Sequence, residues 1–267
     1  MRESRASAAA WRVLHVTVVV IAFFVVWQAG VMVMKPPDYL LPAPLAIFRE
    51  LWSAPLLYFD HALRTIGATL MGFGAALVVG CAAAVGIVYS RILESTIYTL
   101  LVAFNSVPKI ALAPIFIIWM GTGLLSKVAI SFLIALFVIV VDTVLGLRSV
   151  DPDAVDLFRA MRCGRLQTLL RLRIPNALPF LFSGMKVAIS LALVGAIAGE
   201  FVASQAGLGY LILSAQGAFQ TTRVFAAVLL LAVIGTALFF LVDMAERLAC
   251  PWHVSHRARH RGLGDAS

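Results

Sequence analysis

Long apolar segments alternate with short polar segments along the whole chain. Six apolar segments stand out, covering residues 13–34, 62–89, 92–120, 125–147, 184–202 and 224–248. A helix rises about 1.5 Å per residue, so about 20 mainly apolar residues are needed to cross the hydrocarbon core of a bilayer. The pattern therefore predicts an all-α membrane protein with six transmembrane helices.

The composition agrees with this pattern and narrows the class of protein. Of the 267 residues, 62% are hydrophobic and only 13% are charged, and the mean hydropathy is +0.99. Such a small charged fraction cannot cover a water-soluble globule of this size. The composition thus excludes a soluble enzyme and indicates a protein that crosses the membrane several times.

The net charge of +8 raises the question of a nucleic-acid partner. The basic residues lie between the apolar segments instead of forming one patch, which argues against nucleic acid and for membrane orientation, because cationic loops stay in the cytoplasm. With the N-terminus inside, 15 of the 21 Lys and Arg residues fall in inner segments, and the other six are Lys35, Arg49, Arg64, Lys109, Lys127 and Arg223. Both termini are therefore predicted to be cytoplasmic.

The ends of the chain are predicted to be basic and to lie outside the helical core. Residues 1–12 form a basic N-terminus, and the segment 13–34 is too long for a signal peptide and lacks a small-residue cleavage site, so we expect a retained first helix. A core spans 62–248, and 249–267 form a basic tail. His253, His256 and His260 in this tail have spacings that permit metal binding, but we interpret the tail as a lipid-contacting end and expect no metal site.

Small residues recur at every fourth position of the second segment. This stripe consists of Ala68, Gly72, Ala76, Gly80 and Ala84, and a GxxxG pair, Gly195 and Gly199, occurs in the fifth segment. Small residues let helix backbones approach closely in a membrane. The stripe predicts close helix packing, either static or sliding. Three cysteines at unrelated positions, Cys81, Cys163 and Cys250, imply no disulfide framework.

The longest predicted cytoplasmic loop, 148–183, contains a short amphipathic helix. Asp151 suits the N-cap and Pro152 the first turn, and basic residues follow at every third position, Arg159, Arg162 and Arg165. The pattern ends at Ile174-Pro175. Two interpretations stay open, namely a helix lying on anionic lipid and a helix that docks into a cytoplasmic partner.

From about Tyr39 to Trp252 the chain resembles the permease subunits of ATP-binding-cassette importers. The resemblance rests on the order and spacing of three segments, Leu41-Pro42-Ala43-Pro44, Val107 to Pro114 running on to Trp119-Met120-Gly121, and Gly199-Glu200-Phe201-Val202 running on to Gly207-Leu208-Gly209-Tyr210. The branch it resembles transports sulfonates, taurine, nitrate and precursors of thiamine or riboflavin type.

This resemblance implies a MetI-like permease core in the bacterial inner membrane. It further implies a homodimer, cytoplasmic ATPase subunits and a periplasmic or lipid-anchored substrate-binding protein. The transported solute is then a small anion such as a sulfonate, or a thiamine- or riboflavin-type precursor, delivered by that binding protein. Selectivity in such importers lies largely in the receptor, so the sequence leaves the solute open.

The cytoplasmic loop of this family carries a Glu-Ala-Ala motif and a later glycine, which form the coupling helix that docks on the ATPase. Aligned on Ile174-Pro175, the acidic position is Asp156, Leu157 and Phe158 replace the alanines, and Arg162 replaces the glycine. Gly164 is an alternative turn residue, but shifting the motif to it places Phe158 at the acidic position. The ATPase interface that the resemblance implies comprises Asp156, Arg159, Ala160, Arg162, Cys163, Gly164 and Arg165.

Ionisable residues inside membrane spans are costly and are therefore candidates for function. Lys109 lies between Pro108 and Pro114, which should kink or break the third helix near a cavity. Lys109 then either contacts the solute or belongs to a gate or structural pair. Glu200 either pairs with Lys109 or lies in the gate, or it is an exposed interfacial carboxylate. Asp142 faces the cavity or pairs with Arg148. The predicted translocation path comprises Pro108, Lys109, Asp142 and Glu200.

No nucleotide site is expected in this chain. Residues 121–127 superficially resemble a phosphate-binding loop, but Ser126 stands where glycine must precede the lysine, and Val128 stands where Ser or Thr must follow it. ATP and Mg²⁺ are therefore expected on a separate ATPase subunit, with no cofactor in this chain. The main alternative is a secondary transporter driven by an ion gradient, although no internal repeat relates the two halves. An intramembrane enzyme and a pure assembly subunit are further alternatives.

Overall fold

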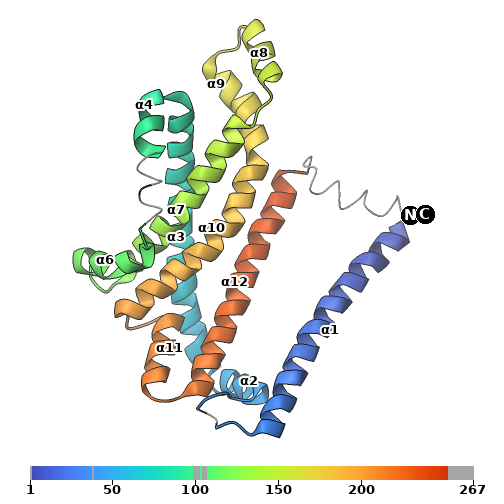
Figure 1. The fold of residues 1–267 in the computed structure, drawn as a ribbon, viewed down its shortest axis with the longest axis vertical. Coiled ribbons are helices and arrows are strands. Elements are labelled where there is room, and N and C mark those ends of the chain that lie inside the picture. The colour runs from blue at the N-terminus through green and yellow to red at the C-terminus, as the bar shows by residue number, and fades with distance from the viewer. Residues whose placement is uncertain (1, 38, 99–102, 104–106, 252–267) are drawn as a thin grey trace.

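The computed structural model describes residues 2–37, 39–98, 103 and 107–251, and every regular element in this part of the chain is helical (Figure 1). The elements, in chain order, are α1 (Arg2–Met34), α2 (Pro44–Ser53), α3 (Pro55–Tyr89), α4 (Arg91–Leu93), η1 (Glu94–Tyr98), η2 (Lys109–Leu112), α6 (Ala113–Met120), α7 (Leu124–Arg148), α8 (Pro152–Ala160), α9 (Arg165–Thr168), η3 (Leu169–Arg173), α10 (Ile174–Ala203), α11 (Leu208–Gly217) and α12 (Thr221–Ala249). The predicted all-α membrane fold is confirmed.

Five helical segments of the described chain are long and apolar enough to cross a membrane. They are Thr17–Met34, Pro55–Tyr89, Leu124–Arg148, Arg165–Val202 and Thr221–Ala249. Five of the six predicted spans therefore correspond to continuous helices, most of which extend beyond the predicted ends. Because the apolar pattern fades before a helix ends in water, hydropathy alone underestimates these lengths.

The remaining predicted span, 92–120, which is the third along the chain, differs from the structure. Its described residues form short pieces, ending in η2 and the eight-residue α6, while residues 99–102 and 104–106 lie outside the described part. Pro108 immediately precedes η2, and Pro114 lies in the first turn of α6. Proline lacks the N–H that a continuous helix needs and clashes with the preceding turn, which explains the interruption.

The small-residue stripe packs α3 against α7, and the GxxxG pair packs α10 against the same part of α7, since Gly72 and Gly195 both meet Ser131. A Cβ on Gly72 would lie 2.8 Å from the Val128 carbonyl oxygen, and a Cβ on Gly195 would lie 2.8 Å from the Ser131 Cα. Every residue of the stripe is buried. The predicted close packing is thus present, with α7 packed closely against both helices.

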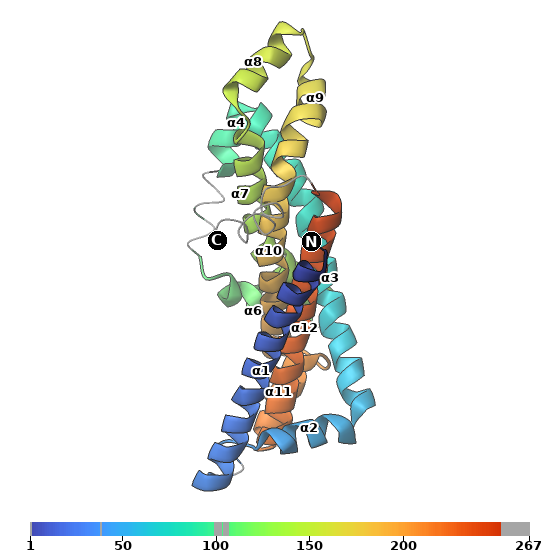
Figure 2. The same cartoon turned by 90° about the vertical axis from the view of Figure 1, so that its right-hand side faces the viewer.

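The first helix diverges from the rest of the bundle in both views (Figures 1 and 2). Near its C-terminal end, Phe24 packs on Phe48 of α2 with ring centroids 5.6 Å apart, and Trp27 lies 6.0 Å from Phe225 of α12. The rest of its apolar surface is exposed in the isolated chain.

Charged side chains link α10 to α12 near the end of the bundle from which α8 projects. Lys186 forms ion pairs with Asp243, at 2.7 Å, and with Glu246, and Arg247 also pairs with Asp243. The N-terminal end of α1 and the C-terminal end of α12 point toward this same end, whereas α2 and α11 lie at the other end (Figure 1).

Candidate functional site

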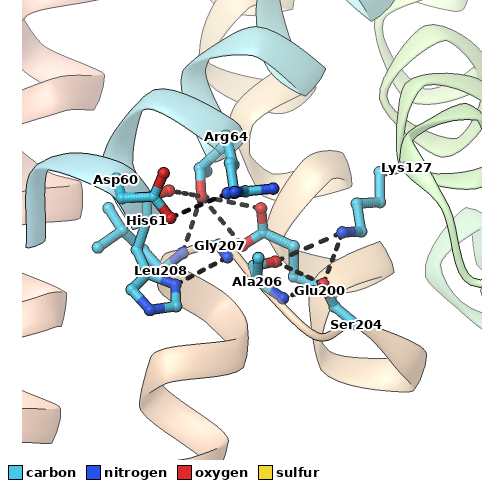
Figure 3. A network of polar contacts seen from close by, with 10 residues as sticks. Asp60, His61, Arg64, Lys127, Glu200, Ser204, Ala206, Gly207 and Leu208 are labelled. Carbon is cyan, nitrogen blue, oxygen red and sulfur yellow. Dashed lines mark hydrogen bonds and ion pairs between the residues drawn. The ribbon is translucent and has the colours of Figure 1, made fainter. Parts of the chain in front are cut away.

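A buried polar network joins α3, α10 and α11 at the end of the bundle opposite α8 (Figure 3). At its centre lies Glu200 of α10, which is only 1% exposed. The hydroxyl of Thr65 donates to the Glu200 carboxylate with an oxygen–oxygen distance of 2.8 Å, and the N–H of Gly209 donates to it at 2.7 Å. A buried carboxylate is tolerated when such hydrogen bonds replace the lost water. The network therefore satisfies a carboxyl group that would be costly to bury without partners.

The same network satisfies the first N–H groups of α11 in order. The N–H of Gly207 donates to Nδ1 of His61 at 3.0 Å, and the N–H of Leu208 donates to the Thr65 hydroxyl oxygen at 2.9 Å. Glu200 accepts from the next N–H, that of Gly209. The first N–H groups of a helix have no intrahelical partner and carry partial positive charge. Side chains from α3 and α10 thus cap α11, whose own N-cap residue has no side chain.

Gly207 allows the carboxylate to approach this closely. Its φ of 114° and ψ of 163° lie in a region that is essentially restricted to glycine. A Cβ at this position would overlap the Glu200 carboxylate, and a Cβ on Gly209 would lie 2.9 Å from the Cβ of Glu200. The Gly-Leu-Gly sequence is therefore a steric requirement of the network.

Cationic side chains border the network. Lys127 of α7 is 8% exposed and donates to the hydroxyl oxygen of Ser204 at 2.5 Å. Arg64 pairs with Asp60 one turn earlier on α3 at 3.0 Å. Arg64 and Lys127 both line a hollow of about 420 Å³ that lies between α3, the start of α7 and the loop before α11. This end of the bundle therefore presents cations on a fixed scaffold.

The structure gives Glu200 partners that the sequence did not. Among the described residues its hydrogen-bond partners are Thr65 and Gly209, whereas the sequence had suggested Lys109. Its burial also differs from the alternative of an exposed interfacial carboxylate. His61, Thr65 and Lys127 were not predicted as site residues from the sequence. The polar residues His61 and Thr65 in an apolar helix were an available indication, but nothing local links Thr65 to a carboxylate 135 positions away.

Lys109 lies in a second hollow, of about 340 Å³, between η2, α7 and α10. Apart from Lys109 the lining is apolar and consists of Val107, Pro108, Ile110, Ile134, Phe137, Val138, Leu191 and Val194. The ammonium nitrogen lies 5.4 Å from the centroid of the Phe137 ring, a cation–π distance. The interrupted helix thus produces a cavity with one cation, as the two prolines suggested.

Asp142 lies in the half of α7 nearer to α8 and packs against Gly184 of α10. A Cβ on Gly184 would lie 2.8 Å from the Cβ of Asp142. Arg148, which the sequence suggested as its partner, instead pairs with Glu94 of η1 at 2.8 Å. A role for Asp142 in the translocation path stays a prediction.

The predicted amphipathic helix corresponds in its first part to α8, which projects beyond the bundle (Figures 1 and 2). The helix ends at Ala160 instead of continuing to Ile174-Pro175, because the backbone at Arg162 is left-handed. The Asp151 side chain accepts from the N–H of Asp153 at 3.0 Å, which confirms the predicted N-cap, and Pro152 is in the first turn. Asp156 and Arg159 form an ion pair at 2.8 Å, with side chains 67% and 75% exposed. Apolar Leu157 and Met161 are exposed beside them.

Arg162 ends α8 in the left-handed conformation that glycine normally adopts. Its φ is 54°, its N–H donates to the Arg159 carbonyl, and the next N–H, that of Cys163, donates to the Phe158 carbonyl. These two bonds form a Schellman motif, in which the left-handed residue is usually glycine. Arg162 therefore adopts the backbone conformation that is typical of glycine, at the position where the family resemblance implies a glycine. Gly164 instead precedes α9 with an extended backbone.

Arg165 begins α9, and Ala160 ends α8. Of the seven residues of the predicted interface, Asp156, Arg159 and Ala160 thus lie on α8, and the other four lie in the turn that follows it and at the start of α9. The histidines of the C-terminal tail lie outside the described residues. Within the described part of the chain, no group of three or more His, Cys, Asp or Glu side chains is placed to hold a metal ion.

Comparison with known proteins assigns the family. The family described as "Binding-protein-dependent transport system inner membrane component" matches residues 76–249, about two thirds of the chain. The chain belongs to this family. The match runs from the middle of α3 to the end of α12, so it includes the α8 projection and Glu200, whereas His61 and Thr65 of the Glu200 network precede it.

Similar permeases cover nearly the whole chain. The riboflavin transport system permease protein RibX of Chloroflexus aurantiacus is 36% identical over 247 residues, 92% of each chain. The formylaminopyrimidine transport permease protein ThiX of Halalkalibacterium halodurans is 32% identical and covers 91% of this chain and 97% of its own. An inward-facing structure of the MetNI methionine ABC transporter matches with a TM-score of 0.66 at 19% identity, covering 74% of this chain and 98% of the matched chain. The predicted importer-permease family and MetI-like fold are confirmed, and the protein is a multi-pass transport permease.

Proposed function

We propose that this permease imports a small solute with energy from ATP hydrolysed on separate cytoplasmic subunits, and that a binding protein delivers the solute. The observation that carries the proposal is the capped, exposed α8 projecting from a helical bundle of the importer-permease family. A helix that served only to pack the bundle would bury its apolar residues, but Leu157 and Met161 are exposed.

The ATPase docks on the tip of α8 and the following turn. The contact surface consists of Asp156, Arg159, Ala160, Arg162, Cys163, Gly164 and Arg165. Exposed Leu157 and Met161 supply apolar anchors between these charged residues, a mixture that is typical of protein interfaces. The predicted cytoplasmic orientation of both termini supports this location, because the N-terminal end of α1 and the C-terminal end of α12 point toward the α8 end of the bundle (Figure 1).

A second copy of the chain completes the translocation path. Ile110, which lines the hollow around Lys109, is exposed, as are Ile118 and Trp119 of the following α6, so a single subunit leaves apolar surface uncovered in this segment. In a homodimer two such hollows face one central path. ATP-driven closure of the ATPases then moves α8 and the helices joined to it, and the interrupted segment around Pro108 changes access from one side to the other. No covalent chemistry is required of this chain.

The transported solute is an uncharged or weakly charged heterocycle of riboflavin or pyrimidine type. Support comes from the printed functions of RibX and ThiX and from the apolar, partly aromatic lining of the Lys109 hollow. A small anion such as a sulfonate is the other class considered. Lys109 alone gives a single positive charge in this hollow, whereas Phe137 offers a surface on which a planar ring can stack.

The proposal is tested by purifying the chain from its native membrane in mild detergent and identifying partners that are present in stoichiometric amounts. We expect an ATPase to copurify with the permease, and each complex to contain two copies of the permease. Uptake by cells should persist with a protonophore while ATP is maintained. Loss of uptake under that condition, together with absence of an ATPase, would instead support an ion-gradient transporter. Stabilisation of the copurifying binding protein by riboflavin, a formylaminopyrimidine or taurine then distinguishes the solute classes.

A further inference from the structure

The ends of three long helices meet at the base of the α8 projection. Tyr89 is the last residue of α3, Leu147 is next to last in α7, and Arg173 is the residue immediately before α10. Gly146 of α7 lies against Ala177 of α10 so closely that a Cβ on it would lie 2.9 Å from the Ala177 Cα. Any movement of α8 must pass through this junction to reach the membrane-spanning helices.

Arg173 contacts both of the other helix ends. Its guanidinium donates to the Leu147 carbonyl oxygen at 3.0 Å, and its Cζ lies 5.9 Å from the centroid of the Tyr89 ring. The Tyr89 hydroxyl in turn donates to the carbonyl oxygen of Arg165, the first residue of α9, at 3.3 Å. A charged donor makes the stronger kind of hydrogen bond, and the last carbonyls of a helix are the electronegative end of its dipole. Arg173 thus holds α7 and α3 to the segment that follows α8.

The backbone around Arg173 is irregular. Residues Leu169–Arg173 form a π-helical turn inserted between α9 and α10. Such turns interrupt the regular ladder of helix hydrogen bonds and occur often at functional positions. Within the described residues the buried Nε of Arg173 also has no hydrogen-bond acceptor. An unsatisfied buried donor is costly, so a rearrangement of this junction that gave Nε an acceptor would be favoured.

We propose that Arg173 is a positioning residue that transmits movement of α8 to α7 and α3 during transport. The inference rests on the proposed docking of an ATPase at α8. Arg173 joins the two moving parts through the Leu147 carbonyl and the Tyr89 ring, and the π-helical turn lets α9 change direction relative to α10 without breaking this attachment. A junction without Arg173 lets the ATPases close while the membrane helices stay in place.

The matched control is Arg171 in the same π-helical turn. Its side chain is exposed, so Arg171→Met removes the same charge two residues from Arg173 without removing the contacts to Leu147 and Tyr89. Arg173→Met retains much of the side-chain length and apolar volume but has no donor. Arg173→Lys retains a charged donor, and Tyr89→Phe retains the ring but loses the hydroxyl.

The experiment uses the complete complex of permease, copurified ATPase and binding protein in lipid nanodiscs. Hydrogen exchange is measured with and without ATP trapped by vanadate, a probe that needs no knowledge of the solute. In the wild type we expect trapping to change exchange in peptides from α8–α9 and also at the ends of α3 and α7. In Arg173→Met the change at α8–α9 should persist, while that at the ends of α3 and α7 should fall by about tenfold, the size expected when a hydrogen bond to a charged group is lost.

The same preparations give the ATPase rate, which separates transmission from assembly. Arg173→Met should hydrolyse ATP within about twofold of wild type, Arg171→Met should resemble wild type in both readouts, and Arg173→Lys should recover part of the response. A normal response of the α3 and α7 ends in Arg173→Met would overturn the inference while leaving the proposed function intact. If no ATPase copurifies with the wild type, the proposed function itself fails. If Arg173→Met does not assemble, Tyr89→Leu decides, because it removes the ring that Arg173 contacts, and a normal response in it counts against the proposal.

Discussion

The Glu200 network at one end of the bundle and the α8 projection at the other hold charged residues in opposite ways. At the α11 end, Glu200 is enclosed by Thr65 and the N–H of Gly209 and is almost unexposed. At the α8 end, Asp156 and Arg159 pair with each other in water. A buried, fully bonded charge fixes the positions of three helices, whereas exposed charges leave a surface free for a partner. The difference indicates that one end is built to stay rigid and the other to be acted upon.

Gly207→Ala should produce the largest effect and break the rigid end. The new methyl group would occupy the space of the Glu200 carboxylate in a conformation that alanine strongly disfavours, so we expect a loss of roughly 4 kcal/mol of stability. Thermal unfolding in mild detergent measures this loss. Gly164→Ala is the control, because Gly164 has an extended backbone and open space around its Cβ position. Equal unfolding temperatures for the two variants would contradict this account.

Glu200→Leu should have the next largest effect. The N–H of Gly209 and the hydroxyl of Thr65 would lose their buried acceptor, at a cost of about 2–3 kcal/mol. Glu200→Gln keeps an acceptor oxygen and should cost less. Thermal unfolding of both variants measures the difference. If Leu and Gln at this position are equally stable, the hydrogen bonds to Glu200 contribute little.

Arg162→Gly should stabilise the projection by about 1 kcal/mol, because glycine adopts the left-handed conformation at the end of α8 without steric cost. Hydrogen exchange of α8 in the isolated permease measures this gain, and Arg165→Gly in the first turn of α9 is expected to destabilise. If the Arg162 side chain also contacts the ATPase, the same variant should bind the ATPase more weakly despite its more stable helix. Unchanged or tighter association would remove Arg162 from the interface.

Asp156→Ala should have the smallest effect on the isolated chain. An exposed ion pair contributes about 0–0.5 kcal/mol, so the unfolding temperature should hardly change. Replacing Asp156 and Arg162 together with alanine should nevertheless weaken ATPase association while leaving membrane insertion normal. Copurification of the ATPase with the double variant measures this, and undiminished association would contradict the assignment of α8 as the docking helix.

Much of the fold followed from local sequence patterns. Hydropathy located five membrane-crossing helices, the fourth-residue spacing of Ala68 to Ala84 identified the buried face of α3, and Asp151-Pro152 located the start of α8. Each feature depends on residues within one helix, so a single sequence contains the information. The break near Pro108 was also expected, but the chain there forms short helices where one kinked span was predicted.

The site was less predictable, because its contacts join distant parts of the chain. Glu200 was singled out as an ionisable residue in a predicted span, with its burial left open. Its partner Thr65 lies on another helix, and Thr residues also occur in apolar helices without any such role. Lys127 fell inside a predicted span, but its contact with Ser204 of the loop before α11 could not be read from the sequence. Arg162 was noted as a departure from the family motif, and only the backbone revealed that it retains the conformation of the missing glycine.

The ion pairs between α10 and α12 also constrain how the protein is made. Lys186 precedes Asp243 by 57 residues, so at a synthesis rate of about 5–20 residues per second it is added to the chain roughly 3–11 s before its partner. During this interval its ammonium group must stay in water or among lipid headgroups, because an unpaired charge is costly in the hydrocarbon layer. The last helix therefore completes the insertion of an earlier one, and a chain truncated before Asp243 would leave α10 incompletely seated in the membrane.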